Sequence, residues 1–103
     1  MNTLRLNPTQ TETLAKFLAL GQSPRLNFDF DAIMASYAKS VGAGFYPTTW
    51  VMSDYVAEEL WYHMYEAHSG DRDVENIGGW KAIDSIIGLV AELPAVKEAH
   101  KRG

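Results

Sequence analysis

The sequence predicts a mainly α-helical fold, a compact single-domain bundle of four to five helices over residues 1–103, with a minor two-stranded β element near the N-terminus. Three observations predict this class. Apolar residues recur at helical spacing in several segments, glycines separate these segments, and a chain of 103 residues suffices for one core but not for two. With 47% hydrophobic and 21% charged residues, the chain has the composition of a folded domain.

The first helix is expected at residues 8–20. Asn7 is a favourable N-cap residue, and Pro8 suits the first helical position, where a missing N–H group costs nothing. Thr9 with Glu12 offers an alternative capping box. A glycine directly after the segment predicts its end.

The next segment has two interpretations. Residues 26–30 belong to a stretch in which apolar and polar residues alternate strictly, and this pattern favours a strand paired with residues 3–6. Alternatively, Asp29 or Asp31 caps a helix that begins at Ala32. The sequence leaves both open.

Three longer helices and a short one are expected after this point. They cover residues 32–41, 48–68, 80–93 and 95–101. The segment 80–93 is apolar around most of its circumference, so we expect it to be the central, most buried helix. Pro94 separates it from a polar terminal helix.

The helix predicted at residues 48–68 is the most aromatic part of the chain. An advance of about 100° per residue divides it into two sides. The side expected in the core carries Trp50, Ala57, Leu60, Trp61, Met64 and His68. The side expected at the surface carries Tyr55, Glu58, Glu59, Tyr62, His63 and Glu66.

Charge is distributed unevenly along the chain. No lysine or arginine occurs between Lys39 and Arg72, and residues 54–75 hold seven acidic residues against one basic, a local charge of −6. Direct binding of nucleic acid through this segment is not expected, because such binding rests on Lys and Arg neutralising phosphates. A surface that meets a basic region of another protein fits the charge better.

We therefore predict a partner-binding surface on the aromatic helix and the acidic linker after it. Tyrosine is enriched in protein interfaces, and carboxylates beside it would pair with Lys or Arg of a partner. The predicted residues are Tyr55, Glu58, Glu59, Tyr62, His63, Glu66, Asp71, Asp73 and Glu75.

Signals for chemistry are sparse. Glu59, His63 and Glu66 share one helix face, but no second helix supplies the partner ligands that a di-iron bundle needs, so Glu59 and His63 are better explained as a surface pair. The sequence after Asp71 lacks the glycine and the final glutamate of a calcium loop. No catalytic residue, cofactor or metal site is predicted.

Three hypotheses follow for function. The first is a non-enzymatic binding module or inhibitor that covers a basic, nucleic-acid-handling surface of a partner by mimicking nucleic-acid charge. Phages and plasmids use small acidic proteins in this way against host defence nucleases, an analogy of composition only. The second is a homo-oligomer, such as a homodimer, with an interface built from Trp50, Trp61, Trp80 or the Phe45-Tyr46 loop. The third is a small metal protein or enzyme centred on His63.

The expected location is the cytoplasm. The chain contains no cysteine, so disulfides are excluded and nothing points to an oxidising compartment. Its N-terminal residues lack an apolar run of signal-peptide length, and no membrane contact is expected.

Overall fold

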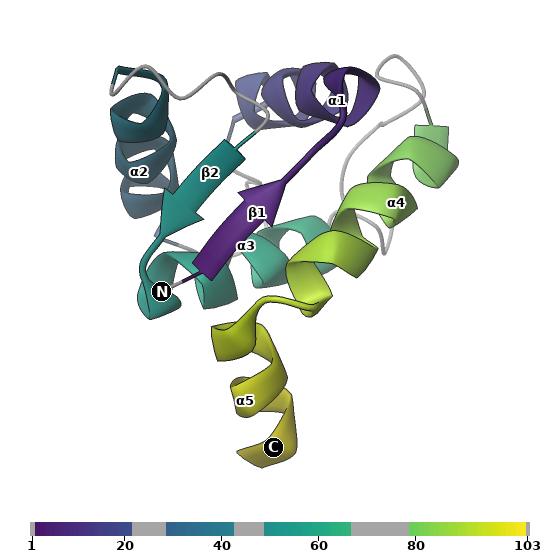
Figure 1. Ribbon diagram of the computed structural model, residues 1–103. Coiled ribbons are helices and arrows are strands. Elements are labelled where there is room, and N and C mark those ends of the chain that lie inside the picture. The colour runs from purple at the N-terminus through teal and green to yellow at the C-terminus, as the bar shows by residue number, and fades with distance from the viewer. Residues whose placement is uncertain (1, 22–28, 43–48, 67–78, 103) are drawn as a thin grey trace.

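A computed structural model describes residues 2–21, 29–42, 49–66 and 79–102 of the protein (Figure 1). In chain order the elements are β1 (Asn2–Arg5), α1 (Pro8–Ala19), α2 (Phe30–Gly42), β2 (Thr49–Met52), α3 (Asp54–Glu66), α4 (Gly79–Ala91) and α5 (Pro94–Arg102). The predicted class is confirmed. These ranges form a mainly α-helical domain with five helices and a small antiparallel sheet.

The sheet joins two segments that are far apart in sequence. β1 pairs antiparallel with β2, and Leu4 lies opposite Trp50. The prediction of a strand at residues 3–6 is thus close to the observed β1, but its predicted partner at residues 26–30 is wrong. The partner consists of four residues at the start of the helix predicted from residue 48, where threonine, tryptophan and valine favour extended backbone.

α2 begins where the alternating stretch ends. Phe30 is its first residue, and the Oδ1 atom of Asp29 accepts a hydrogen bond from the Ala32 amide at 3.1 Å. This N-terminal cap satisfies one of the amides that a helix start leaves unpaired. The alternative in which Asp29 caps a helix is therefore confirmed, although the helix begins at Phe30 and not at Ala32. Residues 26–28 lie outside the described ranges.

α1 begins with a reciprocal cap. Asn7 Oδ1 accepts from the Gln10 amide at 2.7 Å, and the Asn7 amide donates to Gln10 Oε1 at 3.0 Å. Asn7 is thus the N-cap as predicted, and the alternative box from Thr9 is not the one that forms, since Thr9 lies inside the helix.

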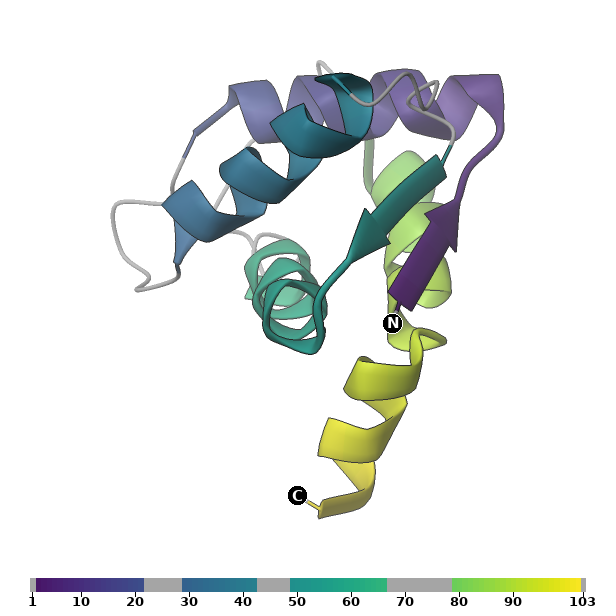
Figure 2. The same ribbon diagram turned by 60° about the vertical axis from the view of Figure 1, so that its left-hand side comes forward.

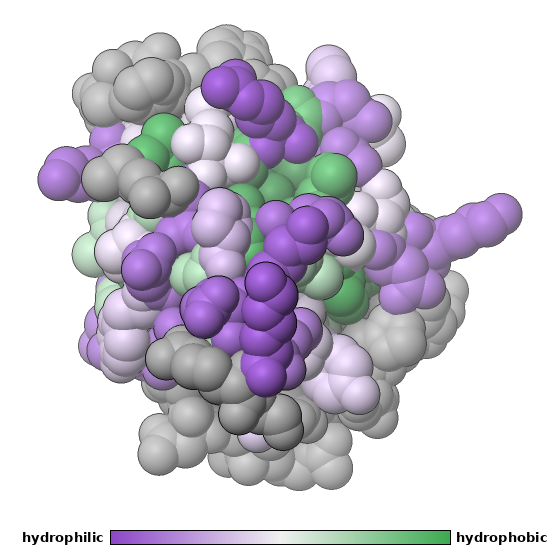
Figure 3. All heavy atoms as spheres, turned by 60° about the horizontal axis from the view of Figure 1, so that its bottom comes forward, coloured by the Kyte–Doolittle hydropathy of each residue, from purple (hydrophilic) through white to green (hydrophobic). Residues whose placement is uncertain are grey.

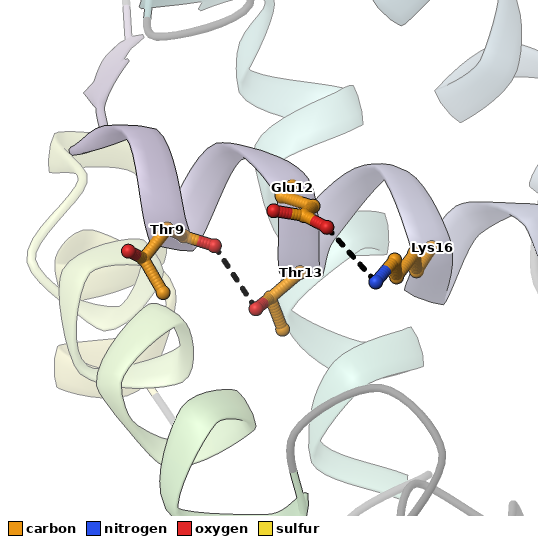
Figure 4. Close-up of polar contacts among 4 residues, drawn as sticks. All are labelled: Thr9, Glu12, Thr13 and Lys16. Atoms are coloured by element: carbon orange, nitrogen blue, oxygen red, sulfur yellow. Dashed lines mark hydrogen bonds and ion pairs between the residues drawn. The ribbon is translucent and has the colours of Figure 1, made fainter.

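Two further contacts run along α1 (Figure 4). The buried Thr13 hydroxyl donates to the Thr9 carbonyl oxygen at 3.0 Å, and Lys16 Nζ lies 2.9 Å from Glu12 Oε1. Both charged side chains of this pair are more than half exposed, so it contributes little to stability.

α3 is the helix around which the others assemble. It packs against α2, α4 and α5, while α1 packs against α4 and α2 packs against β2. α1 crosses one end of the molecule, and α5 projects from the opposite end in both ribbon views (Figures 1 and 2). The core between these elements holds Leu4, Leu14, Phe17, Ile33, Trp50, Leu60, Met64, Ile83, Ile86 and Val90.

The expected position of residues 80–93 as the most buried helix is wrong. Among the described side chains of α4, Ile83, Ile86 and Val90 are buried, whereas Leu89 is 37% exposed and Gly88 faces solvent. α4 is therefore an ordinary amphipathic helix with one side in water. The prediction overstated its burial because Leu89, which is apolar in sequence, lies on the exposed side.

A buried asparagine connects three elements. Asn2 is fully buried, its Nδ2 donates to Asp54 Oδ1 at 2.8 Å, and its Oδ1 accepts from the Ala95 amide at 2.9 Å. We call these two bonds the Asn2 network. It fixes β1 to the first residue of α3 and to the first turn of α5, where an amide would otherwise be unpaired.

No helix within residues 2–21, 29–42, 49–66 and 79–102 has the length and apolar character that a membrane span requires.

Candidate functional site

The rotation of α3 about its own axis decides which side chains meet solvent. Its buried side consists of Val56, Ala57, Leu60, His63 and Met64. Ala57, Leu60 and Met64 were predicted in the core and lie there. Trp50, predicted on the same side, is buried as a residue of β2 and donates its indole N–H to Ser36 Oγ at 2.9 Å.

His63 is the clearest correction to the predicted site. It was assigned to the solvent-facing side, but only 1% of it is exposed. Its ring centroid lies 4.8 Å from that of Phe17 on α1 and 5.7 Å from that of Phe30 on α2. His63 therefore belongs to an aromatic part of the core and cannot contact a partner. The prediction that Glu59 and His63 form a surface pair is therefore wrong.

Trp61 takes the marginal position instead. It is only partly buried, its ring stacks on Tyr65 with centroids 4.9 Å apart, and His100 of α5 meets it edge-on at 4.5 Å. α3 is rotated so that the smaller imidazole of His63 packs in the core against the rings of Phe17 on α1 and Phe30 on α2. The larger indole then lies where α3 meets α5.

The exposed side of α3 is a continuous strip of acidic and phenolic side chains. Tyr55, Tyr62 and Tyr65 are 53%, 50% and 47% exposed, Asp54 is exposed, and Glu58 is half-buried among them. We call these five residues the α3 stripe. Tyr55, Glu58, Tyr62 and Tyr65 succeed one another at intervals of three or four positions along the helix, and Asp54 precedes Glu58 by four, which places all five on one face.

Asp54 and Tyr65 are the two members of the stripe that the sequence prediction missed, and Tyr65 is the aromatic one. It follows Tyr62 by three residues and Glu58 by seven, which are helical intervals that place it on the same face. The signal was present in the sequence. It was lost because the assumed core side was centred too close to Trp61.

Tyr55 is partly committed to a contact within the protein. Its hydroxyl donates to Asp29 Oδ2 at 2.8 Å, while Oδ1 of the same carboxylate caps α2. This hydrogen bond, with desolvation and the nearby charges of Asp29 and Glu59, raises the pKa of Tyr55 to about 12. The phenol is therefore a fixed hydrogen-bond donor at neutral pH, and its ring is what it offers to a partner.

The remaining predicted residues lie at or beyond the margin of the stripe. Glu59 is half-buried on the side of Tyr55, and Glu66 is described only as the last residue of α3. Asp71, Asp73 and Glu75, like His68, lie outside the described ranges.

The acidic side chains of the stripe keep their charge available. Within the described ranges, Lys16 pairs with Glu12 and Lys97 pairs with Glu92, and no Lys or Arg pairs with Asp54 or Glu58. The face from which α5 projects is mostly hydrophilic, with smaller hydrophobic areas beside the polar side chains (Figure 3). The stripe thus combines aromatic area with negative charge that no Lys or Arg of the described ranges neutralises.

Other chemistry has little support in the described part of the chain. No three side chains of His, Cys, Asp or Glu gather there in an arrangement that could hold a metal ion. The imidazole on which the enzyme and metal hypothesis was centred is enclosed by the core, where a substrate cannot reach it.

No family model matches this chain, and no curated protein and no solved structure is significantly similar to it. Support for a function therefore comes from the geometry of the stripe.

Proposed function

We propose that this protein is a non-enzymatic binding module, an inhibitor that places the α3 stripe on a basic surface of a partner protein. The observation that carries this proposal is the set of three half-exposed tyrosines interleaved with Asp54 and Glu58 on one helix face. The proposed partner surface is one that normally handles nucleic acid.

The aromatic part of the stripe supports a protein partner. Tyrosine supplies a large, stiff contact area with a polar tip, and it is enriched at interfaces for this reason. Exposed aromatic side chains scattered singly are common on protein surfaces, but here Tyr62 and Tyr65 lie one turn apart on the same face. Keeping α3 soluble does not require two tyrosines at these positions, so they favour a role in binding.

The acidic part of the stripe supports a basic partner. Asp54 and Glu58 carry charge that no described Lys or Arg pairs with. Complementary charge steers association and favours partners of the opposite sign. Surfaces that bind phosphate backbones are rich in Lys and Arg, so an acidic helix of this kind can occupy them in place of nucleic acid. A chain of this type would serve a phage or plasmid against a host nuclease.

The test is a capture experiment with matched variants. The wild-type protein and a Glu58→Lys/Tyr62→Ala variant are immobilised and exposed to host lysate, beside a Glu12→Lys/Leu20→Ala control. Glu12 is an exposed acid and Leu20 an exposed apolar residue, so the control repeats the kind of change away from α3. Circular dichroism confirms that all three are folded.

The proposal predicts a protein that the wild type and the control retain and the α3 variant loses. Double-stranded DNA or heparin should release it, because they compete for the same basic surface. A protein retained equally by the α3 variant, or not displaced by either polyanion, would contradict the proposal.

A second candidate is self-association. Lys97 and Lys101 are exposed on α5, which packs against α3, so the basic side of one copy complements the stripe of another. Trp50 no longer supports this candidate, since it is buried in the core. A dimer that persists on dilution in size-exclusion chromatography with light scattering would favour it.

A further inference from the structure

We infer that the α3 stripe recognises an arginine side chain of the partner, with Glu58 pairing with the guanidinium and the Tyr65 ring stacking on it. This inference rests on the proposed function, because it specifies the chemistry of the basic surface. A lysine at the same place would pair with the carboxylate but would not stack on the aromatic ring.

The Tyr65 ring is held in place before any partner arrives. Trp61 and Tyr65 are stacked with an interplanar angle of 16°, and His100 packs edge-on against the same indole. One face of the Tyr65 ring is therefore occupied by Trp61, while 47% of the residue remains exposed. A preorganised ring loses little conformational freedom on binding, which favours affinity.

Glu58 lies where it can act together with this ring. It precedes Tyr62 by four residues and Tyr65 by seven, so the carboxylate and both phenols share one helix face. It is half-buried, which weakens the screening of its charge by water compared with a fully exposed acid. No Lys or Arg of the described ranges competes for it.

Guanidinium fits this arrangement better than ammonium. The guanidinium group is planar, stacks on aromatic faces, and donates two parallel hydrogen bonds to a carboxylate. An ammonium group is a compact, strongly hydrated charge without a stacking plane. A carboxylate beside aromatic rings on one rigid helix therefore discriminates between the two cations.

The experiment compares hexaarginine and hexalysine peptides, which carry equal charge. Each is titrated into the isotopically labelled full chain, and binding is located by shifts of the α3 amide signals and the Trp61 indole signal. We expect both to move α3 signals and hexaarginine to bind roughly three- to tenfold more tightly.

Variants assign the preference to named side chains. Tyr65→Leu keeps apolar bulk but removes the ring, and it should bring the affinity ratio close to one. Glu58→Gln should weaken both peptides, whereas Glu12→Gln, the same change on α1, should leave the ratio and the α3 shifts unchanged.

The outcomes separate this inference from the proposed function. Equal affinity of both peptides for α3, or a preference that survives Tyr65→Leu, would overturn the arginine inference and leave the proposed function standing. Peptides that bind without moving any α3 signal would overturn both. If α3 signals shift when the protein alone is concentrated, a second copy occupies the stripe, and the arginine inference is wrong.

Discussion

The outer faces of α3 and α4 differ although the two helices are equal in length, each with 13 residues. The outer face of α4 mixes both signs of charge with small residues, and its exposed apolar side chain is Leu89. The outer face of α3 carries Tyr55, Tyr62 and Tyr65 with acids alone. The described side chains on the outer face of α4 show that a helix of this protein can be solvated without exposed aromatic residues. The three tyrosines of the α3 stripe are therefore more than solvation requires.

If α3 and α4 differ only in their outer faces, their inner faces should contribute equally to the free energy of unfolding. Core truncations test this and should have the largest effects. Leu60→Ala on α3 and Ile86→Ala on α4 each remove a fully buried side chain. Each should lower the free energy of unfolding by about 2–5 kcal/mol, measured by urea denaturation. If Leu60→Ala lowered the free energy of unfolding by less than about 1 kcal/mol, the inner face of α3 would not be a main part of the core.

The Asn2 network anchors α3 but not α4, and its removal should have the next largest effect. Asn2→Ala leaves the Ala95 amide and the Asp54 carboxylate without their buried partner. The expected loss is about 1–3 kcal/mol of unfolding free energy. Hydrogen exchange should show faster opening of α5 than of α1, and equal protection of the two would contradict the anchoring role.

Gly88 offers a stabilising change on the outer face of α4. Nothing lies within 4 Å of a methyl group placed there, and the backbone is helical. Gly88→Ala should therefore raise the unfolding free energy by about 1 kcal/mol. Gly21→Ala is the matched control. Because Gly21 has a φ of 82°, this substitution should lower the free energy of unfolding instead.

The outer faces themselves should contribute little to stability. Tyr62→Ser on α3 and Leu89→Ser on α4 each remove a partly exposed side chain, and both should change the unfolding free energy by less than about 0.5 kcal/mol. Partner capture should nevertheless be lost in Tyr62→Ser and kept in Leu89→Ser. A large loss of stability in Tyr62→Ser would mean that the tyrosine serves the fold.

Ionisation of Tyr55 should affect stability only in alkaline solution. Its pKa is raised to about 12, above its ordinary value of 10.0, mainly by the hydrogen bond to Asp29. Since the folded state holds this proton more tightly than the unfolded state, the contribution is complete below pH 10 and declines as pH rises towards 12. Ultraviolet titration of the phenols should show Tyr55 ionising last, and Asp29→Asn should remove this delay.

Local signals in the sequence were sufficient for most of the fold. Asn7 and Asp29 mark helix starts by chemistry that acts within three residues, so both caps were predictable. β2 was not, because four residues carry little periodicity and their extended state depends on pairing with β1 about 50 residues away.

The candidate site was half predictable for a related reason. Helical spacing alone grouped Tyr55, Glu58 and Tyr62 on one face. Which neighbouring side chains join them depends on how α3 is rotated against α1 and α2. The contacts of His63 with Phe17 and Phe30 set that rotation, and sequence periodicity does not contain them.

The position of Asn2 has a consequence for synthesis on the ribosome. β1 emerges first, but its strand partner follows about 50 residues later, and the amide that Asn2 caps on α5 lies 93 residues further along the chain. β1 therefore lacks its strand partner until residue 52 has been made, and Asn2 lacks the α5 amide until residue 95 has been made. Contacts of such long range slow folding, and an unpaired strand edge favours aggregation during this interval.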